Sequence, residues 1–145
     1  MAETLGSLCD KLTVVKLKQF HTEQSSVLQS LDVQKKQLQS EIDGFIAAAV
    51  SGNIPLEHLV FASNKIYRKE GNAVADIQGS FGEVFSRLAE INCNLWHEQE
   101  KVYEFEKVPS EQKNTVVKNL ALLNLERNNC IDRINMQFSD IIQKK

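Results

Sequence analysis

Two polar stripes in the second half of the chain carry the side chains that could bind a ligand or do chemistry. The first stripe comprises Arg87, Glu90, Asn94 and His97, and Trp96 beside it is a core anchor or a further member of the candidate ligand site. The second stripe comprises Asn124, Arg127, Asn128 and Asp132. Most members recur at steps of three or four residues, which places them on one side of an α-helix. Arg127 also occupies a position in an otherwise apolar stripe, so the sequence predicts a polar ladder inside a helical hairpin.

The two stripes can face each other because only a short connection around Val108-Pro109 separates their helices. Antiparallel helices joined there would pair residues whose numbers add up to roughly 218. Arg87 would then face Asp132, and Glu90 would face Arg127. Buried polar groups are costly unless they bond to each other. The ladder is therefore either a structural network in which Arg127 forks onto Glu90, or a pocket for a small phosphate- or sugar-containing ligand anchored by Arg127.

Metal and catalytic sites are weaker interpretations of the same residues. Di-iron sites in helical bundles need Glu-x-x-His from two helices, and here His97 precedes its neighbouring glutamates. Those glutamates alternate with lysines, which is typical of a solvated helix face. Cys93 and His97 are four residues apart, but a Cys-His pair on one helix lacks an oxyanion hole. We therefore expect no metal, no cofactor and no catalytic residue.

The chain also repeats one pattern at a distance of 76 residues. The identical pairs are Gly6 and Gly82, Leu12 and Leu88, and His21 and His97. Most other matched positions are only similar. A repeat of this kind indicates related units that bury their apolar faces by packing together. We therefore expect two pseudo-equivalent helical units.

Apolar periodicity predicts long helices in both units. In the C-terminal unit, residues 80–107 and 110–142 each carry one apolar stripe, with Ser110 as the N-cap of the second helix. The residue before Pro109 ends the first helix, and the short connection makes the two helices antiparallel neighbours. The N-terminal unit leaves two alternatives: one helix over residues 4–50, or a second hairpin broken near Ser30–Asp32. The repeat favours the hairpin.

Residues 53–80 connect the two units. Asn53 and Pro55 open a short helix, which should stop before Gly71. The segment Gly71–Gly79 is the expected linker and the expected mobile loop. No segment of the chain has the pattern of a strand.

Composition excludes several classes of protein. A length of 145 residues suits one domain. The formal net charge of −2 argues against a nucleic-acid-binding face. No apolar run approaches the length of a membrane span, and the first residues lack a secretory signal. Cys9, Cys93 and Cys130 are odd in number and lack metal spacing, so we expect reduced thiols in a cytoplasmic protein.

Two blocks of the sequence resemble a known family. The first block is Gly6-Ser7-Leu8-Cys9-Asp10-Lys11-Leu12-Thr13-Val14, followed by Lys18 and His21. The second is Leu95-Trp96-His97-Glu98-Gln99-Glu100, followed by Leu123-Asn124-Leu125-Glu126-Arg127-Asn128-Asn129-Cys130-Ile131-Asp132-Arg133-Ile134-Asn135. Both are similar to motifs of an uncharacterised bacterial all-helical family, the domain of unknown function 4254. Gln99 and Asn135 stand where that family commonly has acidic residues. The resemblance implies a cytoplasmic all-helical fold and assigns no activity.

Together these patterns predict an all-α protein, a four- to five-helix bundle built of two pseudo-repeated antiparallel helical units. One domain would span 1–145, with unit one at about 4–50, the connection at 53–80 and unit two at about 80–143. The favoured function is a non-enzymatic interaction or scaffold protein that associates with itself or with a protein partner. The alternative is ligand binding or catalysis at the polar pocket around Arg127. We expect no nucleic-acid partner and no membrane association.

Overall fold

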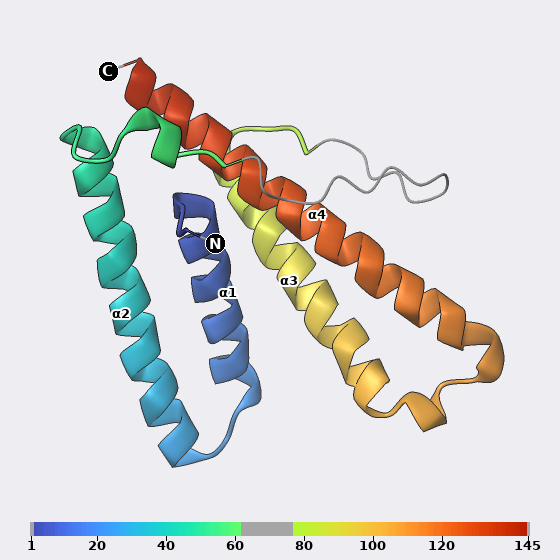
Figure 1. Ribbon diagram of the computed structural model, residues 1–145. Helices are drawn as coiled ribbons and strands as arrows, with labels where there is room; N and C mark the ends of the chain where they lie inside the picture. The colour runs from blue at the N-terminus through green and yellow to red at the C-terminus, as the bar shows by residue number, and fades with distance from the viewer. Residues whose placement is uncertain (1, 62–76, 145) are drawn as a thin grey trace. The chain divides into compact units, whose positions relative to one another are not determined.

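The computed structural model describes residues 2–61 and 77–144, and over these residues the protein is all-α. The elements in chain order are α1 (Leu5–His21), α2 (Ser25–Val50), the 3₁₀ turn η1 (Leu56–His58), α3 (Phe81–Tyr103), the 3₁₀ turn η2 (Phe105–Lys107) and α4 (Ser110–Gln143) (Figure 1). No strand occurs in the described residues. The predicted fold class is confirmed, whereas the pseudo-repeat stays a prediction.

The chain divides into two compact units, and α4 contributes to both. Within the described residues, unit 1 holds 2–61 and 131–144, and unit 2 holds 77–130. The sequence pattern had placed all of 110–142 in the second unit. The structure assigns the end of α4 to unit 1 instead, because that end contacts α1 and α2 through Ile131 and Phe138.

The N-terminal segment is a hairpin, as the repeat predicted, but its break lies earlier than predicted. Helix α1 ends at His21, Thr22 has an extended backbone, and α2 begins at Ser25. The polar run Thr22–Ser26 contains no apolar residue that could continue a buried stripe. A connection this short makes α1 and α2 antiparallel neighbours (Figure 1).

The predicted break at Ser30–Asp32 is wrong, since these residues lie within α2. The Asp32 carboxylate pairs there with the ammonium groups of Lys35 at 3.0 Å and Lys36 at 2.9 Å. Pairs at these spacings join successive turns of a helix and favour its continuation.

Helices α1 and α3 both begin with a capping box, which accounts for part of the repeat. The Ser7 N–H donates to Thr4 Oγ1 at 3.2 Å, and the Thr4 N–H donates to Ser7 Oγ at 2.8 Å. Ser80 and Glu83 exchange the same two bonds at the start of α3, at 3.3 and 3.4 Å. Each box satisfies backbone donors that a helix start leaves without partners. The matched sequences therefore coincide with two helix starts that are built alike.

The repeated glycines, however, have different surroundings. The Gly6 N–H donates to Oδ1 of the buried Asn135 at 2.8 Å. A Cβ at Gly6 would lie 2.6 Å from the carbonyl oxygen of Ile131, so only glycine allows α1 to approach α4 this closely. Gly82 is exposed, and no described atom lies within 4 Å of the position its Cβ would take. The two units begin alike but do not pack alike.

The core of unit 1 collects apolar side chains from α1, α2, the segment after η1 and α4. Its buried members are Leu5, Leu8, Cys9, Val15, Leu31, Ala49, Leu59, Ile134, Phe138 and Ile142. The rings of Phe45 and Phe138 pack with centroids 6.2 Å apart, which joins α2 to α4. Burial of these side chains supplies most of the stabilisation of unit 1.

The short helix predicted after Pro55 is a single 3₁₀ turn in the described residues. Leu56–His58 form η1, and Val60 and Phe61 are not helical. The rest of the predicted helix, and most of the predicted linker from Gly71, lie outside the described residues.

Unit 2 is built on a hairpin of α3 and the first part of α4. Helix α3 ends at Tyr103, earlier than the predicted 107, and η2 replaces its last turn. Val108 is extended before Pro109, as predicted. The span of α4 is confirmed to within one residue, with Ser110 as its first helical residue rather than its cap. The buried apolar residues of unit 2 are Val84, Leu88, Ile91, Val116 and Cys130.

Candidate functional site

The α3 side of the predicted polar ladder lies on the protein surface. The exposed members of the ladder are Arg87, Glu90, Asn94, His97 and Asn124. The half-buried members are Trp96, Arg127, Asn128 and Asp132. Exposed polar groups remain hydrated, so they do not carry the desolvation cost that a buried ladder would. The sequence left open whether the ladder is buried or open, and on α3 its members other than Trp96 are exposed.

Arg87 links the two helices of unit 2. Its Nη2 donates to Glu126 Oε2 at 3.0 Å, and its Nη1 donates to Glu90 Oε1 at 3.2 Å. The predicted register, with Arg87 opposite Asp132, is wrong. That register assumes a turn centred on Pro109, whereas the connection runs from the end of α3 to Ser110 and has its middle in η2. A register centred on the middle of this connection places Arg87 opposite Glu126.

Arg127 does not make the predicted fork onto Glu90. Within the described residues, no hydrogen bond or ion pair joins Arg127 to Glu90 or Asn94, and the buried Arg127 Nε has no hydrogen-bond partner. Asp132 belongs to unit 1. The structure thus brings together Arg87, Glu90 and Glu126, and within the described residues the predicted bond between Arg127 and Glu90 is absent.

The Arg87–Glu126 pair gives a direct test of the hairpin register. Arg87→Ala, Glu126→Ala and the double variant should show a coupling free energy of about 0.2–1 kcal/mol, the range for partly exposed ion pairs. Urea unfolding of the four proteins measures this coupling. The same cycle with Asn124→Ala in place of Glu126→Ala serves as a control and should show no coupling. Equal coupling in both cycles would contradict the observed register.

Cys93 and His97 form a second pair on α3. Cys93 Sγ lies 3.8 Å from His97 Nε2, one helical turn along the chain. Cys93 is half-buried and His97 is exposed, so both can be reached from solvent. The part of the chain that the structure describes contains no cluster of three or more His, Cys, Asp or Glu residues that could hold a metal ion.

The three cysteines should differ sharply in reactivity. Cys9 and Cys130 are buried, and burial raises the pKa of each thiol to about 11. The thiolate is the reactive form, so at neutral pH we expect only Cys93 to react quickly with a thiol reagent. A colorimetric titration should give one fast equivalent in the native protein and three after denaturation. Persistence of the fast equivalent in Cys93→Ser would contradict this assignment.

The same two thiols make stability depend on alkaline pH. Their pKa is higher in the folded chain than the ordinary value of 9.0, so the unfolded chain releases these protons first. The contribution of these two protonated thiols to folding stability is complete below pH 9.0, and it is lost as the pH rises toward about 11. The urea midpoint should fall between about pH 8 and about pH 10 in the wild type, and fall less in Cys9→Ala. An equal fall in both proteins would contradict this explanation for Cys9.

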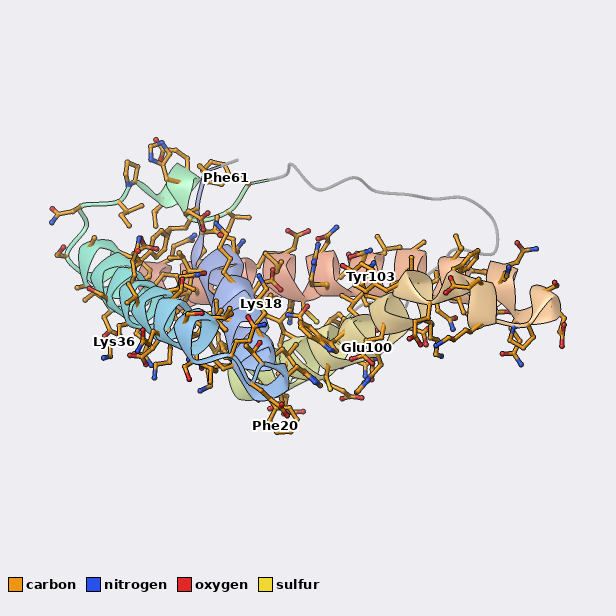
Figure 2. The ribbon with its side chains drawn as sticks, turned by 90° about the horizontal axis from the view of Figure 1, so that it is seen from below. Lys18, Phe20, Lys36, Phe61, Glu100 and Tyr103 are labelled. Carbon is orange, nitrogen blue, oxygen red and sulfur yellow. The ribbon has the colours of Figure 1, made fainter. Side chains whose placement is uncertain are left out.

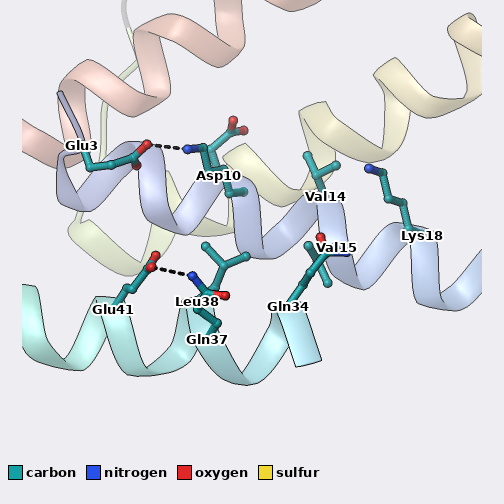
Figure 3. A pocket seen from close by; sticks show the side chains of 10 residues that line it. Glu3, Asp10, Val14, Val15, Lys18, Gln34, Gln37, Leu38 and Glu41 are labelled. Atoms are coloured by element: carbon teal, nitrogen blue, oxygen red, sulfur yellow. Dashed lines mark hydrogen bonds and ion pairs between the residues drawn. The ribbon is translucent and has the colours of Figure 1, made fainter. Parts of the chain in front are cut away.

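A groove between α1 and α2 was not predicted from the sequence. Its volume is about 550 Å³, and its lining residues are Glu3, Asp10, Lys11, Val14, Val15, Lys18, Gln34, Gln37, Leu38 and Glu41 (Figure 3). Glu3 pairs with Lys11, and Gln37 Nε2 donates to Glu41 Oε1 at 3.0 Å. Partial burial raises the pKa of Glu3, but bonds from Lys11 and Ser7 outweigh it and hold that pKa below the ordinary value. These pairs already occupy much of the polar rim, so the groove offers few unused polar groups to a ligand.

Comparison of the chain with protein-family models, with curated proteins and with solved structures found no match. Among the described helices, none combines the length and the apolar character that a bilayer-crossing segment needs.

Proposed function

We propose that this protein is a non-enzymatic helical interaction protein that associates with itself through one end of unit 1. We call this surface the apolar end, and it comprises Ile46, Val50, Leu56, Val60 and Ile141. All five are exposed large hydrophobic residues. They come from the C-terminal part of α2, the segment around η1 and the C-terminal part of α4.

The arrangement of unit 1 supports a common surface for these residues. Figures 1 and 2 both show the end of α2, η1 and the end of α4 at the same end of unit 1. His58 and Phe61 add stacked rings there, with centroids 6.3 Å apart. Scattered exposed hydrophobic residues are normal on a monomer, but apolar side chains gathered from three elements are typical of an interaction surface.

A second copy of the chain is the partner that this surface fits best. Covering apolar area removes it from water and stabilises the associated state, at roughly 25 cal/mol for each Å² buried. A surface at one end of the unit can meet its own copy around a two-fold axis, the commonest symmetry of soluble oligomers.

Sedimentation velocity over a range of concentrations tests the proposal with matched variants. The double variant Leu56→Ser/Ile141→Ser should weaken association at least about tenfold, because two apolar contacts are lost. Val117→Ser is the control, since Val117 and Ile141 are both 56% exposed but Val117 lies in unit 2. Equal association of all three proteins would refute this surface. Circular dichroism confirms that each variant is folded.

Arg127 supports a second candidate function. A guanidinium Nε that is buried without an acceptor among the described residues is energetically unfavourable, and an anionic ligand could satisfy it. Thermal-shift measurements with inorganic phosphate and sugar nucleotides test this function. A shift that Arg127→Ala abolishes would favour ligand binding. No shift across the panel would leave Arg127 with a structural role.

The cellular setting and the family are part of the same proposal. Cys9, Cys93 and Cys130 are all free thiols, which suits a reducing compartment such as the cytoplasm. The motifs around His97 and Arg127 support membership of the uncharacterised bacterial all-helical family. A measured interaction would then be informative for that family as well.

A further inference from the structure

We propose that Cys93 and His97 form a two-donor site for a zinc-class divalent cation on the surface of α3. The two residues are one helical turn apart, and Cys93 Sγ lies 3.8 Å from His97 Nε2. Side chains on a helix lean toward its N-terminus, so the imidazole reaches back over the turn that carries the thiol. This pair needs no movement of the backbone to act together.

The separation of the two donor atoms suits a single tetrahedral ion. Zinc lies about 2.3 Å from a thiolate sulfur and about 2.0–2.1 Å from an imidazole nitrogen, which places the two donors about 3.6 Å apart. The observed separation of 3.8 Å is close to this value. Thiolate and imidazole together favour zinc or copper over magnesium or calcium, which prefer oxygen ligands.

The surroundings of the pair allow an ion to enter. Cys93 is half-buried and His97 is exposed, so neither donor is sealed from solvent. The nearby Lys101 ammonium donates to Glu98 Oε1 at 2.9 Å, so a carboxylate balances its charge. Cys9 and Cys130 are buried and do not compete for the ion.

Binding requires only that the ion exchanges two water ligands for protein ligands and that one proton is released. The Cys93 thiol loses its proton to solvent, the thiolate and the imidazole each displace one water from the hydrated ion, and two waters remain bound. No electron is transferred. Because the site has two protein donors rather than four, we expect affinity on the order of micromolar, far weaker than a structural zinc site. The bound waters leave the ion open to a further ligand.

Spectroscopic titration with cobalt(II), followed by zinc displacement, tests the site in reduced, tag-free protein. The wild type should show a saturable thiolate-to-cobalt charge-transfer band at one ion per chain, which zinc abolishes. Cys93→Ser should lose the band, and His97→Gln should weaken binding at least about tenfold. His21→Gln is the control, since His21 is also an exposed helical histidine, and it should bind like the wild type.

Three results would overturn the proposal. The first is the absence of a charge-transfer band in the wild type at millimolar cobalt. The second is a band that persists in Cys93→Ser, because another thiol would then be the ligand. The third is equal weakening by His21→Gln and His97→Gln. Proton release of one equivalent per ion, measured at constant pH, gives an independent readout. The site does not depend on self-association, so dilute monomeric protein can be used.

Discussion

Gly6→Ala should be among the most destabilising single-methyl changes in this protein. The new Cβ would meet the Ile131 carbonyl oxygen at 2.6 Å and Asn135 Oδ1 at 2.8 Å. Helix α1 would have to move away from α4, which would also stretch the bond from the Gly6 N–H to Asn135. Overpacking and the weakened buried bond together should cost about 2–4 kcal/mol. Urea unfolding followed by circular dichroism measures this loss.

Gly82→Ala is the matched control because the repeat aligns Gly82 with Gly6. Gly82 lies in the first turn of α3, and no described atom would contact its Cβ. Alanine there restricts the unfolded chain and favours helix, so stability should rise by up to about 1 kcal/mol. If both variants had the same effect, the close approach of α1 to α4 would be refuted.

Ile134→Ala should produce the second large loss of stability. Ile134 is completely buried in α4, within the core of unit 1. Truncation removes buried methyl groups and leaves a cavity, which costs about 2–5 kcal/mol. The urea midpoint should fall without a large change in the slope of the transition.

Ile141→Ala is the control for the core of unit 1. It makes the same chemical change in the same helix, but Ile141 is 56% exposed. Its effect on the monomer should stay within about 0.5 kcal/mol. A loss at Ile141 that matched the loss at Ile134 would show that α4 is rotated relative to the structure described.

Local patterns were sufficient to predict the helices. The apolar stripe of residues 110–142 is long and regular, so the span of α4 was predicted to within one residue. The Val108-Pro109 stop was also correct, because the restriction before proline acts on the backbone locally. The break between α1 and α2 was misplaced because it was transferred from the repeat rather than read from the polar run Thr22–Ser26.

Contacts between distant segments could not be predicted in the same way. Gly6 and Asn135 are far apart in sequence, and nothing local shows that one will donate a hydrogen bond to the other. The pairing of Arg87 with Glu126 depends on where the connection turns, so a small error in the turn displaced every predicted pair. The predicted bond of Arg127 to Glu90 depended on that register, and it is absent from the described residues for this reason.

The direct test of self-association is a sedimentation equilibrium measurement on the wild-type chain. The monomer mass is 16.4 kDa. If the apolar end of unit 1 joins two copies, the weight-average mass will rise with concentration toward that of a dimer, and Leu56→Ser/Ile141→Ser will shift the rise to higher concentration. A mass that stays at 16.4 kDa up to millimolar protein would contradict the proposed function.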